Sequence, residues 1–268
     1  MNNSSASDEA YLALILDALA VCRNYKPKFG QGSKAGLTLD EFQELYQQDA
    51  FYTWFGLDSP LVYAAHKAAG GATSVYRQIG IACERLFRQI LQDTLGLEPA
   101  QARWSYKVPG AGGQERILSL DGRLAIADIR ESKRVPLVRE WLQEAAADAR
   151  VERRIAARLR GAVFEVRQGY KSKDSKRQNA DIGNAANAYA SSYLPVVALL
   201  SAQIDSDIEE RYARAQWLIL KGSPRGSHIK STYVFFRDVL GYDLAEFFKR
   251  NSPQIKREVE AIIEALLR

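Results

Sequence analysis

Five short apolar runs follow residue 100, and segments with helical character separate them. Runs of this length that are rich in Ile, Val, Leu and Phe are typical of strands, whereas amphipathic charged segments are typical of helices. The runs cover residues 116–120, 123–129, 162–171, 195–202 and 215–220, and the main helical segments between them are 136–160 and 175–193. This order predicts an α/β fold with a central mixed β-sheet flanked by helices.

The first hundred residues have helical patterns instead. Thr38 and Glu41 have the spacing of a capping box, and Pro60 after Ser59 indicates a helix start. A further helix is expected over 74–95, after Gly70-Gly71. We therefore predict two regions. A helical N-terminal lobe over 1–100 contributes helix 74–95 to the core, and an α/β core over 101–268 ends with helices at 232–250 and 254–267.

The composition limits the function classes. The two cysteines, Cys22 and Cys83, are too few for a disulfide framework, and His66 and His228 have no neighbours at zinc-ligand spacing. The net charge of +5 and the isoelectric point of about 9.1 favour a polyanionic partner without requiring one. No apolar run is long enough to span a membrane, and the polar start lacks signal-peptide features, so we expect a cytoplasmic protein with no membrane partner.

A glutamate stands within one predicted strand. Glu165 lies between Phe164 and Val166, and strand alternation places Arg167 and Lys171 on the same face as Glu165. A carboxylate at such a position is unfavourable unless a neighbouring cation or a metal ion compensates for its burial. Glu165 is therefore the first candidate for a functional residue.

A basic segment follows this strand directly. Lysine and arginine bind phosphates and guanine edges, and asparagine and glutamine bind adenine, so this mixture is typical of DNA recognition. The alternative is a solvated basic strand end and helix start. The candidate DNA-binding residues are Lys171, Lys173, Lys176, Arg177, Gln178 and Asn179.

Cleavage of phosphodiesters with Mg²⁺ requires two or three carboxylates that hold the ion together with a basic group. Asp121 precedes Gly122 at a predicted hairpin turn between runs 116–120 and 123–129, and Asp128 lies within the second run, so either could accompany Glu165. Glu84 lies in the middle of helix 74–95, where Gly80 permits close helix packing. Its alternative role is a surface ion pair with Arg88.

In this order of residues the chain resembles type II restriction endonucleases of the PD-(D/E)xK superfamily. The resemblance covers residues 77–250: a helix with Gly80 and Glu84, then a strand aspartate, then Glu165-x-Arg167 and a basic strand-to-helix element. The segment 176–180 is loosely similar to the element with which the CCGG-cutting branch reads its sites, and in that branch a second metal carboxylate can stand on the helix, here Asp181. Two departures are Leu120 or Ala127 where a proline is usual, and Arg167 where a lysine is usual.

The resemblance implies a Mg²⁺-dependent, site-specific double-stranded DNA endonuclease that acts as a homodimer at a short palindromic site and is paired with a cognate DNA methyltransferase in a prokaryotic host. The α/β core over 101–268 would then be the catalytic and DNA-binding core. Two alternatives remain open: a repair or junction nuclease of the same fold, and a non-catalytic nucleic-acid-binding protein. The implied metal ligands are Asp121 or Asp128, Glu165, and Glu84 or Asp181, and the implied basic catalytic residue is Arg167, Lys171 or Lys173.

Overall fold

The computed structural model describes residues 3–29, 35–109, 114–169 and 175–267, and for residues 3–6, 109 and 175–182 it describes the backbone alone. These residues form two compact units. Unit 1 comprises residues 1–82 and 250–268, and unit 2 comprises residues 83–249. The boundaries lie within two long helices, whereas the sequence prediction divided the chain after residue 100.

Unit 1 is helical. Thr38 and Glu41 form the predicted capping box, with the Thr38 hydroxyl accepting from the Glu41 amide, so this prediction is confirmed. Ion pairs of Arg23 with Glu258 and of Arg250 with Asp8 join the two ends of the chain within this unit. Its helices are α1 (Asn3–Ala20), α2 (Leu39–Gln47), α3 (Ala50–Trp54), the first part of α4 (Pro60–Leu95) and the last part of α10 (Leu244–Leu267).

Helix α4 begins at Pro60 as predicted, but Gly70 and Gly71 do not interrupt it. A Cβ on Gly70 would lie 2.1 Å from the Tyr25 hydroxyl, and one on Gly71 would lie 2.4 Å from Leu266. The two glycines therefore allow neighbouring segments to approach the helix closely, and this packing outweighs the weak helix propensity of glycine.

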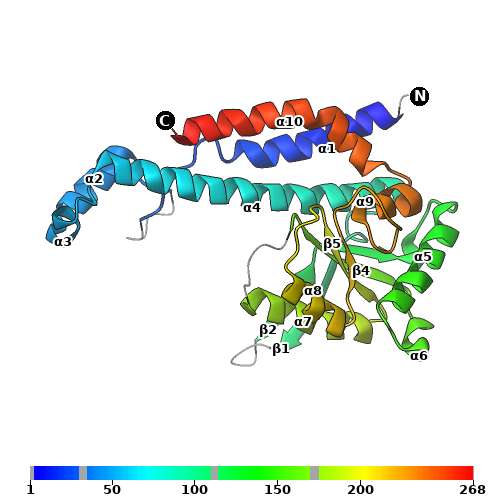
Figure 1. Ribbon diagram of the computed structural model, residues 1–268. Coiled ribbons are helices and arrows are strands. Elements are labelled where there is room, and N and C mark those ends of the chain that lie inside the picture. Colours follow the sequence, from blue (N-terminus) through cyan, green and yellow to red (C-terminus); the bar gives the residue numbers. More distant parts are fainter. Residues whose placement is uncertain (1–2, 30–34, 110–113, 170–174, 268) are drawn as a thin grey trace. The chain divides into compact units, whose positions relative to one another are not determined.

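Unit 2 contains two sheets, which Figure 1 shows as arrows with helices on both sides. Strands β1 (Trp104–Pro109) and β2 (Glu115–Leu120) form an antiparallel pair. The second sheet has the order β3-β4-β5-β6, in which β3 pairs antiparallel with β4 and the remaining strands pair in parallel. These strands are β3 (Gly122–Ala125), β4 (Gly161–Arg167), β5 (Leu194–Leu199) and β6 (Leu218–Leu220). The predicted α/β class and mixed sheet are confirmed.

The predicted hairpin at Asp121-Gly122 is wrong. Strand β2 pairs with β1, whereas β3 pairs with β4, so Asp121 links strands of two different sheets. The predicted strand over 123–129 is also too long, because it ends at Ala125 and continues as the 3₁₀ helix η2 (Ile126–Asp128). Local turn propensity was therefore overridden by the longer-range pairing of Gly122 with Phe164.

Helices cover both faces of the second sheet (Figure 1). On one face the Phe164 ring lies against Trp141 of α5 and Phe235. On the other face Val163 packs in a cluster with residues of α7 and α8. The predicted helix over 136–160 is in fact two helices. The helices of these layers are α5 (Arg134–Asp148), α6 (Arg153–Ala156), α7 (Ser175–Ala190) and α8 (Ser206–Arg214).

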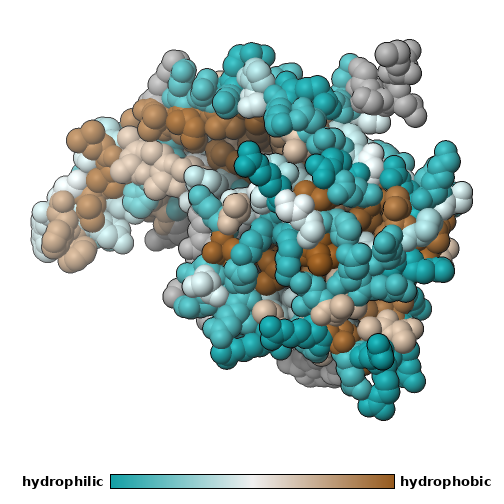
Figure 2. Space-filling model, turned by 45° about the vertical axis from the view of Figure 1, so that its right-hand side comes forward, coloured by the Kyte–Doolittle hydropathy of each residue, from teal (hydrophilic) through white to brown (hydrophobic). Residues whose placement is uncertain are grey.

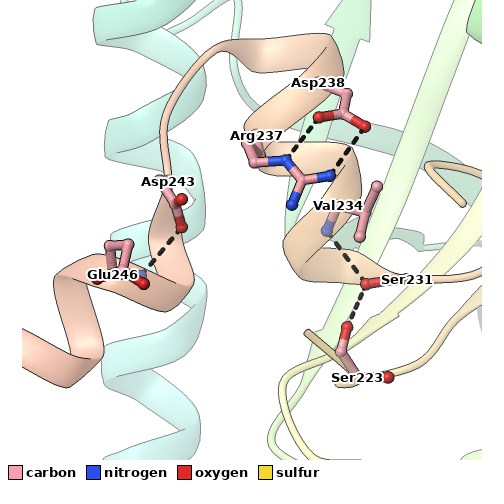
Figure 3. Close-up of polar contacts among 7 residues, drawn as sticks. All are labelled: Ser223, Ser231, Val234, Arg237, Asp238, Asp243 and Glu246. Carbon is pink, nitrogen blue, oxygen red and sulfur yellow. Dashed lines mark hydrogen bonds and ion pairs between the residues drawn. The ribbon is translucent and has the colours of Figure 1, made fainter. Parts of the chain in front are cut away.

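Hydrogen bonds that cap helix starts stabilise the last part of unit 2, residues 223–246, as Figure 3 shows. The Ser231 hydroxyl accepts from the Val234 amide at 3.1 Å and donates to the Ser223 carbonyl, and Asp243 accepts from the Glu246 amide at 3.0 Å. The predicted helix over 232–250 is accordingly divided at Gly241, which has a φ of 78°. Its parts are α9 (Thr232–Val234), the π-helix η3 (Phe235–Leu240) and the start of α10. None of the helices in the described ranges has the length and apolarity needed to cross a membrane.

Candidate active site

Strand β4 buries a carboxylate. Its residues from Gly161 to Val166 are all buried, and Glu165 is only 5% exposed. Among the described residues, no other aspartate, glutamate, lysine or arginine is buried to this degree. Burying a charged group away from water costs roughly several kcal/mol of free energy unless a partner compensates. Glu165 therefore needs a counter-charge nearby.

Arg167 supplies this counter-charge. It lies two residues further along β4, on the same face of the strand, and its guanidinium forms an ion pair with the Glu165 carboxylate. Both side chains are largely shielded from solvent, with exposed fractions of 15% for Arg167 and 6% for Glu165. The expectation that a cation accompanies Glu165 is confirmed for this pair.

Asp121 joins the pair from the link between β2 and β3. Its Oδ2 atom accepts a hydrogen bond of 2.8 Å from the Val166 amide and lies 3.7 Å from Nη1 of Arg167. The hydrogen bond from the Val166 amide holds the Asp121 carboxylate against β4, beside Glu165 and Arg167. Asp121 and Glu165 therefore share the guanidinium of Arg167 in a largely buried site.

Helix α4 holds the Asp121 link in place. Arg88 donates from Nη1 to the Asp121 carbonyl at 3.0 Å. Gly122 allows the close approach, because a Cβ there would lie 2.8 Å from the Phe87 ring and 3.6 Å from Leu91. The sequence patterns had indicated Arg88 only as a surface partner of Glu84.

Asp128, the second candidate aspartate, has a different environment. It lies in η2 rather than in a strand, and its carboxylate forms an ion pair of 2.7 Å with Arg123. Both of these side chains are 25% exposed. Since Asp121 shares Arg167 with Glu165, the geometry favours Asp121 over Asp128 as the partner of Glu165.

Glu84 lies on α4, one helical turn before Arg88 and on the same side of the helix. It neighbours the Cys83 thiol, whose pKa is raised to about 12 by burial and, to a smaller extent, by the negative charge of Glu84. No metal-binding group of three or more acidic, cysteine or histidine side chains occurs in the described part of the chain, so Glu84 is not placed in such a cluster with Asp121 and Glu165.

The basic segment leads into α7. This helix follows β4 and precedes the parallel strand β5, so its first turn lies at the same end of the sheet as Arg167. Ala185 and Ala188 of α7 pack in the cluster that also holds Val163, on the face to which Glu165 belongs. The backbone thus brings the start of α7 towards the site. Lys171 and Lys173 lie outside the described residues, and the side chains of Lys176, Arg177, Gln178, Asn179 and Asp181 do as well.

The structure adds a polar pair that no sequence pattern indicated. Tyr106 of β1 donates from its hydroxyl to Oδ1 of Asn184, which is buried on α7. Burial raises the pKa of the Tyr106 hydroxyl, so it remains a donor at neutral pH. The one available signal was an asparagine within an alanine-rich helix. This pair links the β1–β2 sheet to α7.

Two carboxylates around one guanidinium are a suitable donor set for Mg²⁺. This ion is usually held by one or two carboxylates, and waters and phosphate oxygens complete its octahedron. Asp121 and Glu165 supply hard oxygen ligands, and neither histidine nor cysteine stands among the contacts described here. The residues present therefore fit a hard divalent cation better than zinc.

No family model matches the chain, and no curated protein or solved structure is significantly similar to it.

Proposed function

We propose that this protein is a Mg²⁺-dependent DNA endonuclease of the PD-(D/E)xK kind, with a restriction-endonuclease-like core. The observation that carries the proposal is the convergence of Asp121, Glu165 and Arg167 on one antiparallel strand pair. The spacing Glu165-x-Arg167 on the second strand of that pair agrees with the motif, with arginine in place of the usual lysine. The order of α4, the β3–β4 pair, α7 and β5 agrees with the resemblance derived from the sequence.

Asp121 and Glu165 would hold the metal ion in this function. When bound, Mg²⁺ polarises the scissile phosphate and makes a bound water a better nucleophile. The proposed reaction is a single hydrolysis, in which one water adds to the phosphorus and one P–O bond of the DNA backbone breaks. Glu84 or Asp181 would complete the coordination shell of the metal ion in the complex with DNA.

Arg167 would act as a charge-stabilising group. A guanidinium does not lose its proton in proteins, so Arg167 cannot be a general base, but it can donate two hydrogen bonds to a phosphate. In the protein without DNA it forms an ion pair with Glu165 and lies 3.7 Å from Oδ2 of Asp121. During the reaction it would donate to phosphate oxygens as negative charge develops there. Lys171 or Lys173 would orient the attacking water.

The DNA would be recognised by Lys176, Arg177, Gln178 and Asn179 at the start of α7, which follows β4 at the end of the sheet where Arg167 lies. We further propose that the site is a short palindrome, that the enzyme acts as a two-fold homodimer, and that a cognate methyltransferase protects the host DNA. Symmetry of the protein would then match symmetry of the site.

The direct test is incubation of the purified protein with plasmid and phage DNA, with Mg²⁺ or with EDTA, followed by gel electrophoresis. Discrete fragments that require Mg²⁺ and are lost in the Glu165→Ala variant are the expected result. Non-specific degradation would indicate a repair or junction nuclease of the same fold. DNA that stays intact with every substrate would contradict the nuclease proposal.

A second function has one observation in its favour. The Glu165–Arg167 ion pair satisfies both charges without a metal, as a structural pair in a non-catalytic nucleic-acid-binding protein would. That function predicts salt-sensitive DNA binding with no cleavage in Mg²⁺. A mobility-shift assay beside the cleavage assay separates the two.

A further inference from the structure

Unit 1 exposes a cluster of large apolar side chains around α3 and the start of α4. Trp54 is 80% exposed and Leu61 is 81% exposed, although side chains of this kind are normally buried. Figure 2 shows apolar surface gathered over this end of the helices. We call this surface the aromatic patch, which consists of Phe51, Tyr52, Trp54, Phe55 and Leu61.

The patch is ordered by contacts among its own rings and with α2. The rings of Tyr52 and Tyr46 stack with centroids 4.6 Å apart, and those of Phe51 and Phe55 lie 4.9 Å apart. Asp49 caps α3 by accepting from the Phe51 amide at 2.9 Å. Because the rings of Phe51, Tyr52 and Phe55 are already positioned, burying them against a partner costs little additional conformational entropy.

The acidic side chains around the patch disfavour anionic partners, although Lys26 lies near Glu41. Residues 35–66 contain five carboxylates, namely Asp40, Glu41, Glu44, Asp49 and Asp58, and no lysine or arginine. The whole chain, in contrast, has a net charge of +5. DNA and anionic bilayers would both be repelled by this segment. An apolar protein surface is the type of partner that the exposed side chains of the patch favour.

The area of the patch is sufficient for a dimer. Aromatic side chains bury roughly 150–250 Å² each when they are fully covered. Four aromatic residues and a leucine at the observed exposures therefore offer about 500–800 Å² per copy. Two such patches together reach the roughly 1,000 Å² that distinguishes a specific interface from a chance contact.

We propose that the aromatic patch is a self-association surface that binds the same patch of a second copy about a two-fold axis. A second copy presents an apolar surface of equal size, so each patch covers the other in an isologous interface. The carboxylates would lie at the rim, where like charges repel at low ionic strength. The inference goes beyond the proposed nuclease activity, because the chain would dimerise through this patch whether or not it cleaves DNA.

Sedimentation velocity of the full-length protein tests the proposal. We expect a dimer at micromolar concentrations that strengthens as NaCl is raised, since salt screens the rim carboxylates and leaves apolar contacts intact. The Trp54→Ser/Phe55→Ser variant should be monomeric with an unchanged circular dichroism spectrum. Ile117→Ser removes a comparably exposed side chain from β2 and serves as the matched control, which should stay dimeric.

Three results would overturn the proposal. The first is a parent protein that stays monomeric up to a concentration of about 100 μM, at which even weak specific dimers are populated. The second is a Trp54→Ser/Phe55→Ser variant that remains dimeric, and the third is a dimer that weakens as salt is raised. A Mg²⁺-dependent cleavage assay on the same samples reports separately on the nuclease proposal.

Discussion

Two aspartates flank strand β3, Asp121 directly before it and Asp128 in η2 after it, and each lies next to an arginine in different surroundings. At the start of β3, Asp121 is held by a backbone amide and shares Arg167 with the buried Glu165. At the other end, Asp128 forms a simple pair with Arg123, and both side chains are a quarter exposed. The two sites are similar in chemistry but differ in arrangement: Asp121 and Glu165 both lie against Arg167 and would be available to a metal ion, whereas Asp128 and Arg123 pair one to one.

The largest predicted difference concerns catalysis. Glu165→Gln keeps the size of the side chain and removes the charge that would hold the metal ion. We expect the rate of Mg²⁺-dependent DNA cleavage to fall by about a thousandfold or more. Without the Glu165 carboxylate the metal ion would be held poorly, and this ion would stabilise the negative charge that develops in the transition state. Single-turnover cleavage measures the rate, and a mobility shift without metal should show that DNA is still bound. Retention of most of the rate would remove Glu165 from the site.

The next prediction compares the two arginines in stability. Arg167→Met leaves two carboxylates together in a largely buried site, and breaking a buried pair in this way typically costs about 3–5 kcal/mol. Arg123→Met breaks a more exposed pair and the hydrogen bond from Nε to the Gln101 carbonyl, and the expected cost is about 1–2 kcal/mol. Urea unfolding of both variants gives the two values. Equal losses of stability would show that the ion pairs of Arg167 and Arg123 contribute equally to the stability of the fold.

The glycines at the two ends of the strand pair give a third comparison. A Cβ on Gly161 would lie 2.0 Å from the Leu124 carbonyl oxygen, which is backbone and cannot turn aside. A Cβ on Gly122 would meet the Phe87 ring at 2.8 Å, and a ring can shift. We expect Gly161→Ala to destabilise the fold by about 3 kcal/mol and Gly122→Ala by about 1–2 kcal/mol in urea unfolding. The reverse order would contradict the packing described at Gly122.

The smallest effect is expected from Arg88. Arg88→Met removes the hydrogen bond to the Asp121 carbonyl and keeps the apolar stem, which should cost about 1 kcal/mol of stability. Since this bond positions the link that carries Asp121, cleavage should slow by about tenfold or less, which is the kinetic equivalent of that energy. Thermal melts and cleavage rates of the same variant measure both effects. No change in either would show that Gly122 packing alone fixes the link.

The sequence predicted the α/β class and Glu165 because both follow from local patterns. A glutamate between Phe164 and Val166 in an apolar run marks a buried carboxylate wherever the strand lies in the sheet. The role of Asp121-Gly122 could not be predicted in the same way. An isolated Asp-Gly is most compatible with a hairpin turn, and only the pairing of β2 with β1 and of β3 with β4 makes it a link between sheets.

The same limit applies to Asp128 and to Gly70-Gly71. Asp128 follows a short strand that ends at Ala125, and the end of that strand depends on its register with β4. Two consecutive glycines in α4 are typical of a helix break. The helix continues through them because Tyr25 and Leu266 pack closely against it there. In each case the decisive contact comes from residues distant in the sequence.

The most direct test of the account is a side-by-side cleavage assay of Asp121→Asn and Asp128→Asn with plasmid DNA in Mg²⁺. Both substitutions remove one carboxylate charge from an end of β3 with little change in size. We predict that Asp121→Asn loses cleavage by about a thousandfold while Asp128→Asn stays within about threefold of the parent. Equal loss in both variants, or loss in Asp128→Asn alone, would contradict the assignment of the site to Asp121, Glu165 and Arg167.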